Sequence, residues 1–385
     1  MGAFNVKQFL SYIQADGYEP MTVEAVVYMV TDEEKIATIA SSTTADAQSA
    51  QILTDILKGG TFRPGQMFDL VEQLGINLSV ENDDFLDQVV AAAESIPMAV
   101  YGEGYWADHW EYYLDLIESY LAIYPDGEEE LMYDNKMRYF FSTATVKPRS
   151  EKYVLTYTYD ASSKHVLQLD ATVFDTDKVA EQDAFRIENT GILGIDAYWQ
   201  RTAGGAAFES TPIAKLFLLG SMKYATRDAY GMGVEYEGGR PGWNDAMNGL
   251  PGMVGSGMPE TYEMYLMLQY VKKVVDKYQR PLVIPAELDN MISTVNGALD
   301  DLDASGYTDA EDLLFDVPEE LFNYWDAVAT ARENYRKSIT YYFSGDTTEL
   351  SADAVSSILG RWMTQVEVGM ARALKFGSHG FEDDG

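Results

Sequence analysis

Apolar residues recur at helical spacing along most of the chain, and polar or glycine-rich segments separate these stretches. One apolar stripe runs from Trp110 to Tyr124 with acidic residues off the stripe, and Pro125 then ends the predicted helix. A second helix is predicted to begin at Pro212, a residue suited to a first turn, and to reach about Tyr224. The pattern therefore predicts helices of ordinary length joined by loops.

The same pattern extends through the second half of the sequence. A third helix is predicted to open near Pro259 and to carry on one side an apolar stripe of Tyr262, Leu266, Tyr270 and Val274. Helical patterns also cover approximate ranges elsewhere, namely 44–58, 65–74, 84–95, 285–302, 318–342 and 351–375. We therefore expect a mainly α protein.

One segment departs from the helical period. Between Tyr153 and Tyr159, tyrosine and leucine alternate with valine and threonine, which is the period of a strand. A turn is predicted at 160–164, followed by a second strand from Val166 to Phe174. The pattern thus predicts a small β-hairpin, near 151–174, inserted among the helices.

The succession of many helices with long connections favours a helical toroid over a simple bundle. Such a ring collects its loops at one mouth, where a site can form. We expect the toroid to occupy residues 1–379 as one catalytic domain, and residues 380–385 to form an acidic, frayed tail. There is no heptad run, low-complexity tract or repeat of fixed short period.

Composition narrows the classes of partner. The 385 residues carry a formal net charge of -35, which repels phosphate backbones and makes nucleic acid and anionic membranes poor partners. The chain has no cysteine and three histidines, so we expect no metal site. It shows no secretory signal pattern and no apolar run of about 18 residues, so a cytoplasmic protein is expected.

The most informative segment is the loop from Gly238 to Gly252, which contains five glycines and two prolines. It sets the carboxylate of Asp245 beside the flat ring of Trp243, an arrangement suited to an acid acting on a sugar. The alternative is a tight turn in which Asp245 and Asn244 bond their own backbone. The residues alone leave both interpretations open.

A second cluster lies at residues 101–110, directly before the first predicted helix. Aromatic rings can cover the C–H face of a sugar while carboxylates accept bonds from its hydroxyl groups. The candidates here are Glu103, Trp106 and Asp108. As an alternative, Trp106 belongs to the core and Asp108 caps the helix.

Two arginines could bind an oxyanion, since guanidinium matches phosphate geometry. Arg201 lies beside a Gly-Gly turn, and Arg240 lies five residues before Asp245. Each could equally pair with one of the chain's many acids. Glu235 and Glu237 bring further carboxylates close to the same loop. Counting carboxylates cannot separate a hydrolase, which uses two, from a phosphorolytic enzyme, which needs only the acid.

Trp243-Asn244-Asp245-Ala246-Met247-Asn248 resembles the Trp-Asn-Asp-Gly-Met-Asn box of inverting glycoside phosphorylases of the cellobiose phosphorylase type. The surrounding Gly-Arg-Pro-Gly and Met258-Pro-Glu-Thr-Tyr-Glu263 look closer to the β-1,3-glucan (laminaribiose-type) branch. The run from Glu103 to Tyr120 looks similar to that branch, and Phe208-Glu-Ser-Thr-Pro212 is a weaker match. The resemblance covers roughly residues 100–265.

The resemblance implies an (α/α)6 barrel, a six-hairpin glycosidase-like toroid, with sugar bound at its mouth. It implies phosphorolysis of β-glucosidic linkages with inversion, giving α-glucose 1-phosphate, with inorganic phosphate as co-substrate and no other cofactor. Asp245 maps onto the general acid and must be neutral to donate its proton near pH 7. A β-linked gluco-oligosaccharide is the implied partner. Substrate contacts are expected from Trp106, Asp108, Trp243, Asn244, Arg201, Arg240 and Glu103.

Members of that family are longer, with an N-terminal β-sandwich and later sequence that supplies phosphate ligands, including a histidine. The chain is therefore expected to be a catalytic portion, a split subunit or a degenerate relative, acting as a homo-oligomer or with the missing domains. Two alternatives stay open. One is an inverting hydrolase on the same fold, with Glu103, Asp108 or Glu235 as base. The other is a non-catalytic carbohydrate-binding protein.

Overall fold

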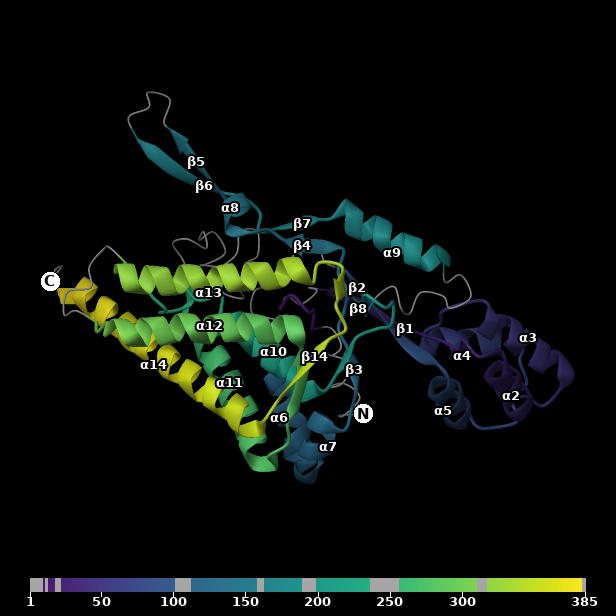
Figure 1. The fold of residues 1–385 in the computed structure, drawn as a ribbon. Coiled ribbons are helices and arrows are strands. Elements are labelled where there is room, and N and C mark those ends of the chain that lie inside the picture. Colours follow the sequence, from purple (N-terminus) through teal and green to yellow (C-terminus); the bar gives the residue numbers. More distant parts are fainter. Residues whose placement is uncertain are drawn as a thin grey trace. The chain divides into compact units, whose positions relative to one another are not determined.

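The computed structural model describes residues 10, 13–17, 22–100, 112–157, 163–188, 199–235, 256–309 and 317–382 (Figure 1). Within these residues the chain forms thirteen α-helices, whereas its strands pair only into sheets of two. The expectation of a mainly helical protein is confirmed. None of the helices in the described ranges combines the length and hydrophobicity that a membrane span requires.

The chain divides into two compact units. The larger unit contains residues 1–20, 103–179 and 198–385, and the smaller unit contains residues 21–102 and 180–197. The extent of the catalytic domain, expected at 1–379 with a tail at 380–385, stays a prediction.

The smaller unit combines one antiparallel strand pair with helices. Strand β1 (Thr22–Met29) pairs with β2 (Glu94–Val100). Side chains with no exposed surface, among them Leu53, Met67 and Phe85, form the centre of its core. The helices are α2 (Glu33–Thr43), α3 (Ala47–Lys58), α4 (Pro64–Gln73) and α5 (Asn82–Ala92).

Sequence reasoning located three of these four helices, but α2 and the β1–β2 pair were missed. The buried face of α2 is limited to Ile36, Ile39, Ala40 and Thr43, which is too short a stripe to be recognised from spacing. Its start is nevertheless fixed locally, because the Asp32 carboxylate accepts bonds from the amides of Glu34 and Lys35. The pairing of β1 with β2 spans more than sixty residues of chain, so no local signal reveals it.

The larger unit is built on helices that the sequence predicts. All six helices predicted for this part of the chain are present. They were expected after Trp110, after Ser210, near Pro259, and at 285–302, 318–342 and 351–375. They are α6 (Tyr112–Ile123), α10 (Pro212–Tyr224), α11 (Met258–Tyr278), α12 (Ala286–Ser305), α13 (Glu319–Ser338) and α14 (Ala352–Glu382). Two short helices that the sequence did not predict join them, α7 (Glu128–Tyr133) and α8 (Arg149–Lys152). The unpredicted helix α9 (Thr176–Glu188) begins in the larger unit, and its residues from 180 onward belong to the smaller one.

Helix α10 lies at the centre of this unit, with every one of its residues buried. Its last residue, Tyr224, stacks on Trp362 of α14 with ring centroids 4.6 Å apart. Helices α12 and α13 lie side by side, and α11 packs along α14 (Figure 1). On α11 the core face is formed by Met264, Met267, Leu268 and Val271, whereas Tyr262 and Leu266 of the predicted stripe are exposed.

Short strands between the helices of the larger unit form two-stranded sheets. Pair β8 (Arg201–Thr202) with β13 (Tyr342–Phe343) is parallel, and the others are antiparallel. The antiparallel pairs are β3 (Met137–Arg138) with β9 (Glu209–Ser210), β4 (Ala144–Val146) with β7 (Thr172–Phe174), β10 (Val234–Glu235) with β11 (Ser256–Gly257), and β12 (Leu282–Pro285) with β14 (Thr347–Leu350).

The predicted β-hairpin is present, but its second strand is shorter than expected. Strand β5 (Tyr153–Tyr157) pairs with β6 (Lys164–Gln168), so Lys164 belongs to a strand and not to the turn. The range 166–174 was wrong as one strand, because residues 172–174 form β7 and pair with β4. The chain leaves the hairpin at Gln168, and hydrogen bonding to β4 then determines the position of residues 172–174.

Candidate functional site

The Trp243-Asn244-Asp245 box, called the acid box below, lies in the segment 236–255. One strand, β10, precedes this segment, and its pairing partner β11 follows it. Val234 pairs with Gly257 and Glu235 with Ser256, so the described residues on either side of 236–255 are neighbours. The amide of Val234 donates to the Thr261 hydroxyl, and the Thr261 hydroxyl donates to the carbonyl of Gly257. Thr261 lies in the first turn of α11 and has no exposed surface, so the β10–β11 pair is anchored in the core.

Asp228 organises the turn that leads into β10. Its Oδ1 accepts hydrogen bonds from the amides of Tyr230 and Met232, at 2.9 and 3.0 Å. Its Oδ2 accepts from the amide of Gly233 at 2.9 Å and from the hydroxyl of Ser256 at 2.7 Å. One carboxylate thus satisfies three backbone amides and joins the two sides of the segment.

Helix α14 supports the same turn from its C-terminal half. The Arg372 guanidinium donates to the Tyr230 carbonyl at 2.6 Å and to both carboxylate oxygens of Asp309. Gly369, on the same helix, lies so close to Gly231 that a Cβ at position 369 would overlap the Gly231 carbonyl. The base of the acid-box segment is therefore fixed by polar bonds and close backbone packing.

Seven of the eight residues expected at the active site lie outside the described residues. They fall into the ranges 101–111 and 236–255, and their roles stay predictions. They are Asp245, Trp243, Asn244, Arg240, Glu103, Trp106 and Asp108.

Of these eight residues, Arg201 lies among those that the structure describes; Glu235, a candidate base for a hydrolase, lies in β10. Arg201 is buried in β8, with its guanidinium carbon 5.3 Å from the centroid of the Tyr342 ring. The Gly-Gly turn beside it comes directly after β8, with Gly205 at a φ of +88°, a backbone conformation that glycine adopts readily. The predicted role of Arg201 in phosphate or sugar contact stays open.

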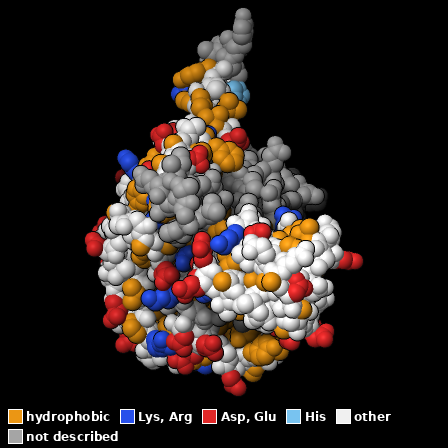
Figure 2. Space-filling view, turned by 90° about the vertical axis from the view of Figure 1, so that its right-hand side faces the viewer, with side chains coloured by type: hydrophobic (Ala, Val, Ile, Leu, Met, Phe, Trp, Pro, Cys, Tyr) orange, Lys and Arg blue, Asp and Glu red, His pale blue; other side chains and the backbone are white. Residues whose placement is uncertain are grey.

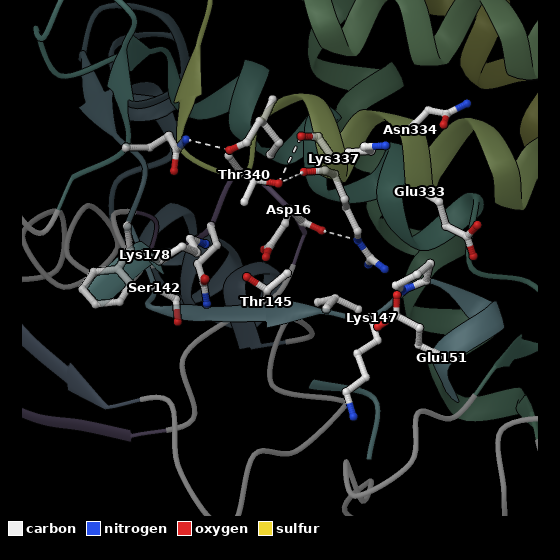
Figure 3. Close-up of a pocket in the computed structure, with 18 residues that line it drawn as sticks. Asp16, Ser142, Thr145, Lys147, Glu151, Lys178, Glu333, Asn334, Lys337 and Thr340 are labelled. Atoms are coloured by element: carbon white, nitrogen blue, oxygen red, sulfur yellow. Dashed lines mark hydrogen bonds between the residues drawn. The ribbon is translucent and has the colours of Figure 1, made fainter. Parts of the chain in front are cut away.

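A cavity of about 390 Å³ lies in the larger unit (Figure 3). Its walls come from the N-terminal segment at 14–16, from β4 and the residues after it, from the start of α9 and from the end of α13. Cavities of this volume can hold a small organic molecule. The polar and charged lining residues are Gln14, Asp16, Ser142, Thr145, Lys147, Glu151, Lys178, Gln200, Glu333, Asn334, Arg336, Lys337 and Thr340.

The cavity lining is unusually rich in cations for so acidic a chain. Four of its side chains are lysine or arginine and three are aspartate or glutamate. Of the three acids, Glu333 is engaged elsewhere, because it accepts from the guanidinium and the backbone amide of Arg149 at 2.9 and 2.8 Å. Without Glu333, the lining has four basic side chains and two acidic ones, although the net charge of the whole protein is -35.

Lys178 is the most deeply buried of these cations. Its Nζ donates to the carbonyl of Ala144 at 3.2 Å and lies 4.7 Å from the centroid of the Phe141 ring. Burial lowers the pKa of its ammonium group, while the carboxylates of Asp16 and Asp175 act in the opposite direction. An added anion in the cavity would favour its charged form.

Gln14 contributes a polar group of a different kind. Its side chain is buried, and its Nε2 has no hydrogen-bond partner within the part of the chain that the structure describes. A buried donor without a partner carries a desolvation cost of about 1–3 kcal/mol. The Nε2 atom has almost no accessible surface, so it lies within the wall of the cavity.

Sequence reasoning missed every residue of this cavity. Gln14, Lys178 and Lys337 lie on segments more than 150 residues apart, and none belongs to a motif. The basic pair Arg336-Lys337 at the end of α13 is typical of a helix C-terminus and carries no functional signal alone. Only the packing of α13 beside β4 and the N-terminal segment makes the pair part of a cavity.

Neither a comparison with models of protein families nor a comparison with curated proteins finds a match to this sequence. Across the described ranges, no group of three or more His, Asp or Glu side chains is arranged to hold a metal ion.

Proposed function

We propose that this chain catalyses phosphorolysis of β-glucosidic linkages in oligosaccharides with inversion, giving α-glucose 1-phosphate. The observation that carries the proposal is the Trp243-Asn244-Asp245 box, set between two strands that pair with each other. Catalytic residues are commonly found on loops that a rigid scaffold holds at both ends. The bonds of Asp228, Thr261 and Arg372 supply such a scaffold.

In this mechanism Asp245 is the general acid and inorganic phosphate is the nucleophile. A phosphate oxygen attacks the anomeric carbon from the face opposite the leaving group, while Asp245 gives its proton to the departing glycosidic oxygen. The new C–O bond to phosphate replaces the broken glycosidic bond, which inverts the anomeric centre. The sugar would lie at the mouth of an (α/α)6 barrel, against Trp106, Asp108 and Trp243, and Asn244, Glu103, Arg240 and Arg201 would supply further contacts.

The direct test is release of glucose 1-phosphate from laminari- and cello-oligosaccharides, with and without inorganic phosphate. We expect a phosphate-dependent product that is lost in Asp245→Asn. Asp301→Asn is the matched control, because Asp301 is an exposed carboxylate on α12. Its activity should equal that of the unmodified protein.

The same assay separates the alternatives. Free sugar released without phosphate would overturn phosphorolysis and support an inverting hydrolase, which needs a second carboxylate about 6.5–9.5 Å from the acid. Oligosaccharide binding that survives Asp245→Asn, with no turnover under any condition, would support a non-catalytic carbohydrate-binding protein.

A further inference from the structure

We propose that the cavity between β4, the N-terminal segment and the end of α13 binds a small hydroxylated oxyanion, a sugar phosphate or a sugar carboxylate. Lys178 would bind it from the buried side, and Lys337 from the exposed side. This site is additional to the one proposed around Asp245 and does not depend on it.

Size excludes a bare inorganic ion as the best fit. A volume of about 390 Å³ lies within the range of pockets that hold small organic molecules, and a single phosphate would leave much of it empty. Hydroxyl groups of Ser142, Thr145 and Thr340 also line the cavity and offer oxygen atoms to a polyol. A sugar that carries one acidic group matches both the volume and this lining.

Charge selects an anion over a neutral or cationic ligand. With Glu333 bonded to Arg149, the lining retains four cations against the carboxylates of Asp16 and Glu151. The ammonium groups of Lys147 and Lys337 form no ion pair within the described part of the chain. Their convergence on one cavity therefore favours an anionic ligand.

The donor on the buried side of the cavity, Lys178, favours the same class of ligand. Gln14 belongs to the wall of the cavity and is only 3% exposed. Lys178 is 6% exposed, and its Nζ donates to the Ala144 carbonyl with further N–H groups left for a ligand. A buried ammonium group at the cavity matches the acceptor oxygens of an oxyanion. Figure 3 shows Lys178, Ser142 and Asp16 around the cavity.

Isothermal titration calorimetry with α-glucose 1-phosphate, glucuronate, inorganic phosphate and glucose tests the proposal. We expect one of the two charged sugars to bind more tightly than inorganic phosphate, and glucose not to bind. The preferred sugar tells a phosphate ligand from a carboxylate ligand. If neither charged sugar binds, or if glucose binds equally well, the proposal is wrong.

Variants assign the binding to this cavity. Gln14→Glu replaces an amide donor with a repelling carboxylate, and Lys178→Met removes an ammonium donor. Each should raise the dissociation constant at least about tenfold. Asp16→Asn should lower it, since a repelling carboxylate is lost. Lys152→Met is the matched control, because Lys152 is also buried but does not line the cavity.

Two further variants keep the test decisive. Lys337 is exposed on α13, so Lys337→Glu should fold normally and still weaken binding if the cavity is the site. Asp245→Asn should leave the dissociation constant unchanged. If binding is lost in Asp245→Asn but unaffected by Lys337→Glu, the ligand occupies the acid-box site and the cavity proposal fails, whereas the proposed function is untouched.

Discussion

The carboxylate of Asp228 accepts a hydrogen bond from the hydroxyl of Ser256 over 2.7 Å, and this bond joins the residues before and after the acid-box segment. The same carboxylate accepts three backbone amides of the turn that leads into β10. Because Asp228 and Ser256 are separated by 28 residues in sequence, the bond closes a loop that contains Asp245. Asp228 therefore acts together with Thr261 and Arg372 in holding the residues that flank 236–255.

Asp228→Ala should lower the free energy of unfolding by about 2–4 kcal/mol, because three amides and a hydroxyl lose a charged acceptor. Ser256→Ala removes only one of these bonds and should cost about 1 kcal/mol. Urea unfolding followed by circular dichroism measures both. Equal losses in the two variants would contradict a role for Asp228 as the acceptor shared by the whole turn.

Two glycines on α14 should respond to alanine in opposite directions. At Gly369 a methyl group would overlap the carbonyl of Gly231, so Gly369→Ala should destabilise the protein by more than about 2 kcal/mol. At Gly360 the nearest atom is the Lys272 Cε, 3.7 Å away on a flexible side chain. Gly360→Ala should therefore stabilise the helix by about 0.5–1 kcal/mol. Thermal unfolding of the pair tests this contrast.

Lys215 on α10 makes stability depend on pH in the alkaline range. The side chain is fully buried, with its Nζ donating to the Arg138 carbonyl and lying 4.5 Å from the centroid of the Tyr139 ring. Burial holds the pKa of the Lys215 ammonium well below 10.5 in the folded protein, whereas the unfolded chain keeps the ordinary value. Between these values the unfolded state binds more protons, so stability rises with pH.

Lys215→Met should remove this contribution. Between about pH 7 and pH 10, the free energy of unfolding of the unmodified protein should rise relative to that of Lys215→Met, by at most about 1.4 kcal/mol per pH unit. Urea unfolding at three pH values in this range measures the difference. Lys272→Met, at an ion-paired surface lysine of α11, is the control and should show no such trend. A constant difference for Lys215→Met would refute the prediction.

The β5–β6 hairpin should contribute little to the stability of the larger unit. Leu155 and Leu167 are each 53% exposed, and Figure 2 shows apolar side chains on the surface of the hairpin. Leu155→Thr and Leu167→Thr should each change the free energy of unfolding by less than about 0.5 kcal/mol. In contrast, Leu359→Ala in the core should cost about 2–5 kcal/mol. A large loss from either hairpin variant would show that the hairpin is packed in solution.

If Asp245 is the general acid, phosphorolysis should decline as pH rises through the pKa of its carboxyl group, because only the protonated acid can donate. We expect a basic limb near neutrality in the pH dependence of kcat/KM. Measurement of initial rates between about pH 5 and pH 9 reveals it. A profile that stays flat above neutrality would remove Asp245 from this role.

Local pattern was sufficient for elements whose signals are contiguous in sequence. Pro212 after Ser210 and Thr211 set the start of α10, and the alternation from Tyr153 to Tyr157 identified β5. The pattern failed where a distant partner decides the outcome. Residues 172–174 continue the alternating pattern of β6. In the structure they pair instead with β4, with Thr172 opposite Val146. The spacing of apolar and polar residues within one segment cannot reveal a hydrogen-bond partner some 26 residues away.

By itself, the sequence determined that the protein is mainly helical and where most of its helices lie, and it predicts the acid box around Asp245. These features depend on side-chain spacing and capping within a few turns, and such interactions act between near neighbours. Only the tertiary structure decided that Asp228 bonds to Ser256, that Lys215 is buried, and that Gln14 and Lys178 line one cavity. Those relationships arise when the packing of helices brings distant segments together, and burial then changes the energy of each polar group.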